Sequence, residues 1–155
     1  MATGGDTPTA RVHEMLERIA DAAGVDASVN VRVQADGLRA EYVGDDLGLL
    51  IGHHGQTIDA IQHLAYRIAT RGETDRQPVV VDAAGYRERQ AEALCATADQ
   101  AAQTAVSNRR AVPLEAMSAL ERKVIHEHLK DRHDIETYSE GQEPARYLVV
   151  APLVD

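Results

Sequence analysis

The chain has 155 residues, of which 44% are hydrophobic, so it can form one ordinary domain or two small ones with a buried core. No apolar run approaches the roughly 20 residues of a membrane span, and the polar N-terminus has no secretory signal; both features predict a cytoplasmic protein without membrane insertion. The single cysteine, Cys95, excludes an intrachain disulfide framework and a multi-cysteine zinc site. The formal net charge of −9 argues against a polyanionic partner on bulk charge, so any nucleic-acid site must be a local arrangement.

The N-terminal half of the chain mixes helical and strand-like patterns. Residues 1–7 are small and polar, which predicts a disordered segment. The spacing of apolar residues, with Gly and Pro as boundaries, then predicts the following elements. They are a helix over 8–24, a β-hairpin over 28–43, a short helix over 47–51, a helix from 58 to 72 and a strand over 79–81.

The hairpin sequence also predicts a register. Asp36-Gly37 is a favoured two-residue turn pair. That turn would place Val33 opposite Ala40 and Val31 opposite Tyr42, with the apolar residues on one face of the hairpin.

Two helices followed by two strands are expected in the C-terminal half. A long alanine-rich helix from Gly85 to about Arg110 ends before Pro113, which we interpret as a helix breaker. A second helix is predicted from Glu115 to Arg132, and two strands over 135–139 and 145–151. Because helices and strands do not alternate strictly, the order favours the α+β class over a doubly wound sheet.

A glycine loop, Gly52-His53-His54-Gly55, separates two of the predicted helices. The glycines would let a ligand approach the backbone without a Cβ in the way. The helix after the loop would direct its free N–H groups and its positive dipole end to the same place, which suits a phosphodiester group. The alternative is a tight helix–helix turn. A P-loop is excluded because no Lys is present, and a dinucleotide fingerprint because a helix precedes the glycines.

The stretch from Leu50 to Ile58, behind an antiparallel hairpin, resembles the Ile-Gly-x-x-Gly loop of a KH domain. The order α-β-β-α-α-β over residues 8–84 is similar to the type II, bacterial form of that fold. The family favours Lys or Arg at the two middle positions, where this chain has histidines, which can still donate hydrogen bonds to phosphate. The resemblance implies RNA contacts at Gly52, His53, His54 and Gly55.

A cationic stripe is predicted on the helix over 115–132. Arg122, His126 and Lys130 fall within about 80° of one another around the helix axis, beside an apolar edge. Such a stripe can meet an anion at the rim of a cleft; the alternative is a solvated face with incidental spacing. Lys123, Arg109 and Arg110 are added as candidates on charge alone.

The pair Arg122-x-x-x-His126, followed by the ten residues from Thr137 to Arg146, strongly resembles the R-three-H domain, which binds single-stranded nucleic acid. On the family's pattern, Arg122 and His126 would lie at the nucleic-acid surface, with Arg146 beside them on the last strand. A type II KH domain followed by a small R-three-H domain, here over residues 85–155 with its long connecting helix, is the architecture of the Jag family of bacterial RNA-binding proteins. The separate N-terminal domain that many Jag proteins carry has no counterpart in this sequence.

The resemblance implies a non-enzymatic protein that binds single-stranded RNA, or single-stranded DNA, without a cofactor. It also implies a post-transcriptional regulator linked to cell elongation or division, and association with other KH-domain proteins or with a second copy.

Two other functions stay open. One is an interaction or dimerisation module with vestigial nucleic-acid binding, for which the acidic surface and the long alanine-rich helix would serve. The other is a small hydrolase that uses His126 with a nearby acid, although the sequence contains no nucleophile elbow. No metal is expected, because His126 and His128 lie about 200° apart on a helix and cannot chelate together.

Overall fold

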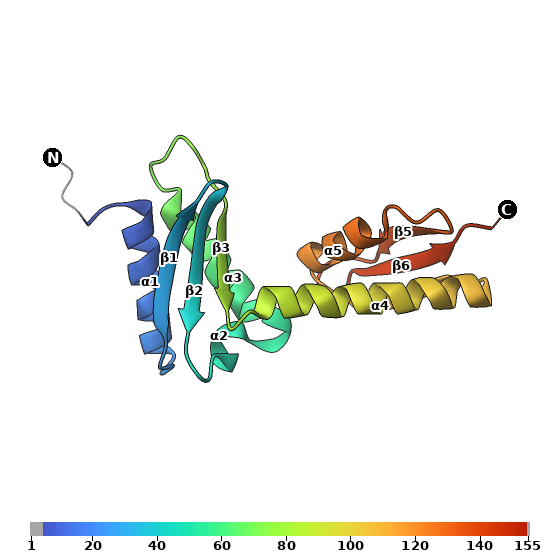
Figure 1. Ribbon diagram of the computed structural model, residues 1–155, viewed down its shortest axis with the longest axis horizontal. Coiled ribbons are helices and arrows are strands. Elements are labelled where there is room, and N and C mark those ends of the chain that lie inside the picture. Colours follow the sequence, from blue (N-terminus) through green and yellow to red (C-terminus); the bar gives the residue numbers. More distant parts are fainter. Residues whose placement is uncertain (1–4, 155) are drawn as a thin grey trace. The chain divides into compact units, whose positions relative to one another are not determined.

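The computed structural model describes residues 5–154 and divides into two compact units, Met1–Arg87 (unit 1) and Glu88–Asp155 (unit 2). Each unit has its own sheet and its own apolar core (Figure 1). The mixed architecture confirms the α+β class. Residues 1–4 of the segment predicted to be disordered lie outside the described residues, while Asp6 pairs with Arg11 and Thr7 is the N-cap of the first helix.

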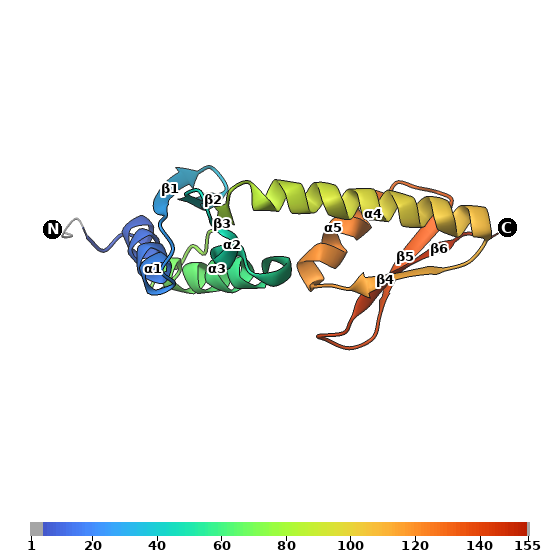
Figure 2. The same cartoon turned by 90° about the horizontal axis from the view of Figure 1, so that it is seen from below.

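Unit 1 is a three-stranded sheet with helices packed on one of its faces, as Figures 1 and 2 show. The strand order is β1-β2-β3, with β1 and β2 antiparallel and β2 and β3 parallel. The order of elements confirms the α-β-β-α-α-β arrangement. The elements are α1 (Pro8–Ala22), β1 (Ser28–Gln34), β2 (Gly37–Val43), α2 (Gly48–Ile51), the 3-10 turn η1 (His53–Gly55), α3 (Gln56–Ala69) and β3 (Val79–Ala83).

The core of unit 1 forms where the apolar stripes of α1 and α3 meet the sheet. Leu16 of α1 and Ile58 of α3 are fully buried, and each such side chain contributes about 1.5–3 kcal/mol relative to an exposed one. Tyr42 of β2 is also buried, and its hydroxyl donates a 2.6 Å hydrogen bond to the carbonyl of Leu16. That bond satisfies the only polar atom of the ring, and burial raises the pKa of Tyr42.

The hairpin prediction was right in its two strands but wrong in its register. Val31 lies opposite Ala40, and Val33 opposite Leu38, whereas the sequence predicts Tyr42 and Ala40 as their partners. The slip amounts to two residues, so the apolar side chains still share one face.

Gly37 explains the shifted register. It pairs with Gln34 as the first residue of β2, so Ala35 and Asp36 form the turn. The φ angle of Gly37 is 140°, and a Cβ there would lie 3.0 Å from the carbonyl carbon of Pro78. Leu38 N–H also donates to the Pro78 carbonyl. Contact with the segment entering β3, rather than local turn preference, sets the position of Gly37.

Unit 2 packs helices against an antiparallel sheet of strand order β4-β6-β5. Alanines on one face of α4, among them Ala98, Ala102 and Ala105, pack against Ile125 of α5 and Leu148 of β6. Small side chains let the helix backbone approach the core closely. The elements are α4 (Tyr86–Asn108), of which Tyr86 and Arg87 belong to unit 1, then β4 (Val112–Ala116), α5 (Ala119–Leu129), β5 (Ile135–Glu140) and β6 (Tyr147–Pro152).

The predicted start of the second helix at Glu115 was wrong, because residues 112–116 form a strand that the sequence analysis missed. Pro113 does end the helical region, but it lies within β4, the edge strand of the sheet. Proline is tolerated on an edge because its missing N–H costs the ladder no bond there. The helix α5 begins after Ser118, whose side chain accepts from Glu121 N–H while Glu121 caps Ser118 N–H in return.

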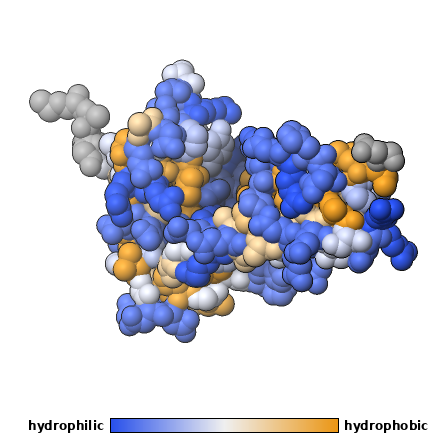
Figure 3. Space-filling model, turned by 45° about the vertical axis from the view of Figure 1, so that its right-hand side comes forward, coloured by the Kyte–Doolittle hydropathy of each residue, from blue (hydrophilic) through white to orange (hydrophobic). Residues whose placement is uncertain are grey.

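Within residues 5–154, no helix is both long enough and apolar enough to cross a membrane. Figure 3 shows one face of the molecule, on which hydrophilic side chains cover more surface than apolar ones.

Candidate nucleic-acid interface

The glycine loop of unit 1 connects α2 to α3 through the 3-10 turn η1, with positive φ at Gly52, His54 and Gly55. Gly52 and Gly55 both have φ of 74°, and His54 has φ of 53°. Left-handed backbone is open to glycine and is tolerated by His and Asp better than by branched residues. Gly55 is the N-cap of α3 and brings no side chain to cap that helix. No side chain caps the start of α3, and the Gln56 N–H already donates to the carbonyl of His53. This start carries the positive end of a 14-residue helix dipole.

His53 and His54 project from this loop into solvent. Both are exposed, and their rings meet edge to face with centroids 4.1 Å apart. The loop therefore presents two imidazoles next to the uncapped start of α3, which is the arrangement that the sequence predicts for phosphate capture.

The two glycines leave room for neighbouring side chains. A Cβ on Gly52 would lie 2.7 Å from Cβ of Thr57, and a Cβ on Gly55 would lie 2.7 Å from two ring carbons of Tyr86. The packing of this loop therefore requires glycine at both positions. The close approach of a ligand to the loop backbone stays a prediction.

An acidic residue also lies in the first turn of α3. Asp59 there forms an ion pair with Arg87, which also donates to the carbonyl of Val81 and to the side-chain oxygen of Gln62. The pair neutralises a carboxylate close to the uncapped helix start.

In unit 2, Arg122 is buried instead of bordering the surface as the predicted stripe required. Its side chain is 8% exposed, donates to the carbonyls of Met117 and Arg146 at 2.6 and 3.4 Å, and forms an ion pair with Glu143. Hydrogen bonding from Arg122 lowers the pKa of Glu143. Arg122 therefore holds the segment between β5 and β6.

The other predicted residues of unit 2 remain accessible to different degrees. His126 is half-buried, with Nδ1 2.6 Å from the hydroxyl of Thr137. Arg146 is half-buried and donates to the carbonyl of Gly141 at 2.7 Å. Lys123 is exposed, and Lys130 is exposed and bonded to Glu127 at 2.9 Å, which raises the pKa of Lys130.

The structure brings part of the predicted set together. Arg122 and Arg146 both bind backbone carbonyls of the segment between Ser139 and Arg146. Arg109 and Arg110 instead lie in the exposed link between α4 and β4. Among the described residues, no group of three or more His, Cys, Asp or Glu side chains is placed to hold a metal ion.

Both units match known domain families. The sequence pattern of the KH domain of KhpA and KhpB matches residues 10–81, and that of the R-three-H domain matches residues 92–152. The chain belongs to the Jag family. Its two domains occur in the order that the sequence motifs indicated, which confirms the resemblance and its fold.

Relatives extend the match over most of the chain. The RNA-binding protein KhpB of Clostridium symbiosum is 35% identical over 140 residues, 89% of this chain and 63% of that protein. KhpB of Bacillus subtilis is 33% identical over 88% of this chain and 66% of that protein. KhpB of Lactiplantibacillus plantarum is 41% identical over 67% of this chain and 32% of that protein. The chain thus spans about one to two thirds of the length of these relatives.

Four residues that shape the candidate sites were not predicted from the sequence. Tyr86 and Arg87 begin α4 and contact the loop and α3, but they follow β3 by a few residues and carry no motif. In unit 2, Thr137 and Glu143 belong to the quoted family stretch, and their roles as partners of His126 and Arg122 could have been inferred from their polar side chains in that stretch.

Proposed function

We propose that the protein binds single-stranded RNA and catalyses no reaction on it. The observation that carries the proposal is the uncapped start of α3 beside two exposed histidines, in a domain of the KhpA/KhpB KH family. A phosphate would accept hydrogen bonds from the imidazoles and from the N–H groups after Gln56 in the first turn of α3, because the Gln56 N–H already donates to the carbonyl of His53. The names of the relatives, RNA-binding protein KhpB, support the same ligand.

A second contact is proposed on unit 2. His126, Arg146, Lys123 and Lys130 supply accessible donors there. Arg122 acts through the segment that it holds, because its guanidinium already serves two carbonyls and Glu143. The match to the R-three-H domain supports nucleic acid as the partner of this unit.

The RNA proposal is tested by titrating a labelled single-stranded oligonucleotide with the protein at low salt. His54→Asp places a carboxylate at an exposed position whose left-handed backbone Asp tolerates. We expect affinity to fall about tenfold or more, since a charge-assisted contact worth roughly 1.5–3 kcal/mol is lost and a repulsion replaces it. His63→Asp, at an exposed position on α3, is the matched control with the same change in charge. Equal effects of the two variants would show that bulk charge, not the loop, governs binding.

We further propose that the protein acts in the cytoplasm as a post-transcriptional regulator linked to cell elongation or division. Family membership supports a role on cellular RNA. Crosslinking in cells, followed by sequencing of the bound RNA, would identify the transcripts, and deletion of the gene should change cell length. A deletion strain of normal length that also yields no crosslinked RNA would contradict this role.

Association with another KH-domain protein or a second copy is the second candidate function. Leu49 of α2 and Leu64 of α3 are 63% and 50% exposed, which is high for leucine. The proposed dimerisation through α4 has less support, because the alanines from 98 to 105 already pack in the core of unit 2. Light scattering of the protein and of Leu64→Glu measures the association state. A homodimer that contacts Leu64 predicts a dimer for the protein and a monomer for Leu64→Glu. A monomer in both cases rules out such a homodimer.

A further inference from the structure

Tyr86, the first residue of α4, lies against Gly55 of the glycine loop. The three atoms nearest to a Cβ placed on Gly55 all belong to the phenol ring of Tyr86. Gly55 is buried although its two histidine neighbours are exposed. Tyr86 also packs against the core of unit 1. The ring therefore supports the one loop residue that serves as N-cap of α3.

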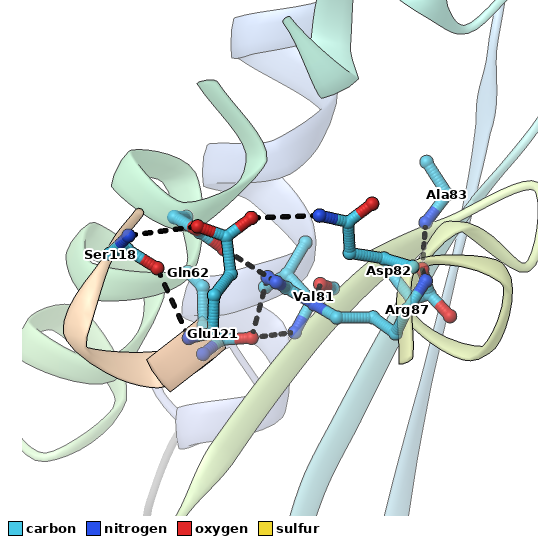
Figure 4. A network of polar contacts seen from close by, with 9 residues as sticks. Gln62, Val81, Asp82, Ala83, Arg87, Ser118 and Glu121 are labelled. Atoms are coloured by element: carbon cyan, nitrogen blue, oxygen red, sulfur yellow. Dashed lines mark hydrogen bonds and ion pairs between the residues drawn. The ribbon is translucent and has the colours of Figure 1, made fainter. Parts of the chain in front are cut away.

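Arg87 connects the start of α4 to two other elements, α3 and β3. Its Nε donates to the carbonyl of Val81 at 3.1 Å, one Nη donates to Gln62 at 3.0 Å, and the other pairs with Asp59. Its backbone N–H donates to Asp82, a side chain that is 2% exposed. Figure 4 shows Arg87 together with Gln62, Val81 and Asp82, with dashed lines for the hydrogen bonds among them.

The charge of this anchor matters for an anionic ligand. Asp59 lies in the first turn of α3, four residues after Gly55, where a free carboxylate would compete with phosphate for the positive end of the helix. Arg87 neutralises it. The anchor is half-buried, with the side chains of Arg87 and Asp59 24% and 31% exposed, so solvent screens the pair only in part.

We propose that Tyr86 and Arg87 are positioning residues of the RNA site in unit 1: Tyr86 fixes the conformation of the loop through Gly55, and Arg87 removes the charge of Asp59 from the start of α3. This inference rests on the proposed capture of RNA at the loop. It assigns the start of α4 to the site, beyond the Gly-x-x-Gly motif itself. A preformed loop binds more tightly because less conformational entropy is lost on binding.

The steric part is tested in the full chain with Tyr86→Ala, Tyr86→Phe and Tyr66→Ala. Tyr66 is a matched control, since its ring packs against the same core from α3. We expect Tyr86→Ala to weaken RNA binding about tenfold and to speed hydrogen exchange of the Gly52–Gly55 amides without RNA, because an unsupported loop regains conformational freedom. Tyr86→Phe measures how much of the support comes from the ring without its hydroxyl, and Tyr66→Ala should leave loop exchange unchanged even if it lowers the melting temperature.

A double-mutant cycle separates a contact from a general loss of stability. Gly55→Ala should weaken binding strongly in the natural background, because the methyl group collides with Tyr86. In the Tyr86→Ala background the collision with the ring is removed and only the backbone strain at φ of 74° remains from that pair, so the additional effect of Gly55→Ala should be smaller. Additive effects of the two substitutions would overturn the proposed role of Tyr86.

The electrostatic part is tested with Arg87→Gln, Asp59→Asn and the double variant. Arg87→Gln should weaken RNA binding several-fold at low salt and less at high salt, because the exposed charge of Asp59 is then screened. Adding Asp59→Asn should restore affinity, although it cannot restore the hydrogen bonds of Arg87. If the double variant binds as weakly as Arg87→Gln, charge neutralisation is wrong.

The outcomes also separate this inference from the proposed function. If the natural protein binds no RNA, the proposed function fails, while loop exchange in Tyr86→Ala still tests the contact. If the natural protein binds RNA and Tyr86→Ala matches it in affinity and loop exchange, the positioning role fails and RNA binding stands.

Discussion

Arg122 belongs to a nucleic-acid-binding motif, but its side chain has a structural role in unit 2. Its buried guanidinium bonds two carbonyls and one carboxylate. Removing it takes a donor from the Met117 carbonyl and from Glu143, while the Arg146 carbonyl keeps its hydrogen bond from the Met117 N–H. Unit 2 therefore depends on Arg122 for the arrangement of the segment between β5 and β6.

Arg122→Ala should lower the free energy of unfolding of unit 2 by about 2 kcal/mol or more. Lys123→Ala, at the adjacent exposed position, should change it by less than about 0.5 kcal/mol. Chemical denaturation followed by circular dichroism measures both. Equal stability of Arg122→Ala and the natural protein would contradict the buried network.

The Arg122–Glu143 pair also predicts a pH dependence. Hydrogen bonding from Arg122 lowers the pKa of Glu143 in the folded protein below its value in the unfolded chain. The stabilisation is then complete above the unfolded pKa and is lost as the pH falls through the lowered one. Glu143→Gln should be less stable than the natural protein near pH 7, and the difference should vanish in strong acid. Thermal unfolding over a pH series measures this, and a difference that grows toward acid would show the opposite sign.

At the loop, histidine gives RNA binding its own pH dependence. Imidazole is the side chain that ordinarily gains charge as the pH falls from about 7.5 to 6, while carboxylates ordinarily stay ionised there. Binding of phosphate and protonation of an imidazole that meets it favour each other by linkage. RNA affinity should rise over this interval at fixed ionic strength. Replacing His53 and His54 with Arg should flatten the response and raise affinity at pH 7.5; a flat response in the natural protein would show that the histidines do not meet phosphate.

At the scale of elements, the sequence predicted helices whose position depends on apolar periodicity and on capping residues. The helix α1 begins at Pro8, as predicted, with Thr7 as its cap, and Gly24 follows its end with φ of 69°. These features depend on neighbours in the chain. The strand β4 and the hairpin register could not be predicted in this way, since an edge position in a sheet and the approach of Pro78 to Gly37 are tertiary facts.

The register of the hairpin gives a stability prediction. Gly37→Ala places a methyl group against the backbone of Pro78 at a φ of 140°, and should destabilise unit 1 by about 2 kcal/mol or more. Gly72→Ala is the matched control, because Gly72 also has positive φ but nothing lies within 4 Å of a Cβ there. The control should cost only the backbone strain of about 1–2 kcal/mol. Thermal unfolding compares the two, and equal losses would mean that Pro78 does not constrain Gly37.

For the candidate site, the sequence predicted the loop but not the side chains that pack against it. The Gly-x-x-Gly spacing and the exposed histidines were predictable from the motif. The packing of Thr57 and Tyr86 against the two glycines was not, because it depends on side chains that the fold brings to the loop.

At the scale of the whole molecule, two small cores support two proposed contacts on an acidic chain with a net charge of −9. Few phosphate contacts should give a shallow dependence of affinity on salt, with about one unit of slope in log affinity against log salt for each contact. Titrations at several salt concentrations should therefore give a slope well below that of a strongly basic nucleic-acid binder. A steep slope would require many more cationic contacts than the structure offers.

The central claim is that RNA phosphate binds at the start of α3, beside the histidine loop. The most direct measurement is a nuclear magnetic resonance titration of the isotope-labelled full chain with a single-stranded RNA oligonucleotide. The account predicts the largest amide shift changes from Gly52 to Thr57, with a second, smaller set around His126 and Arg146. Saturable RNA binding that leaves the amides of Gly52 to Thr57 unmoved would contradict it.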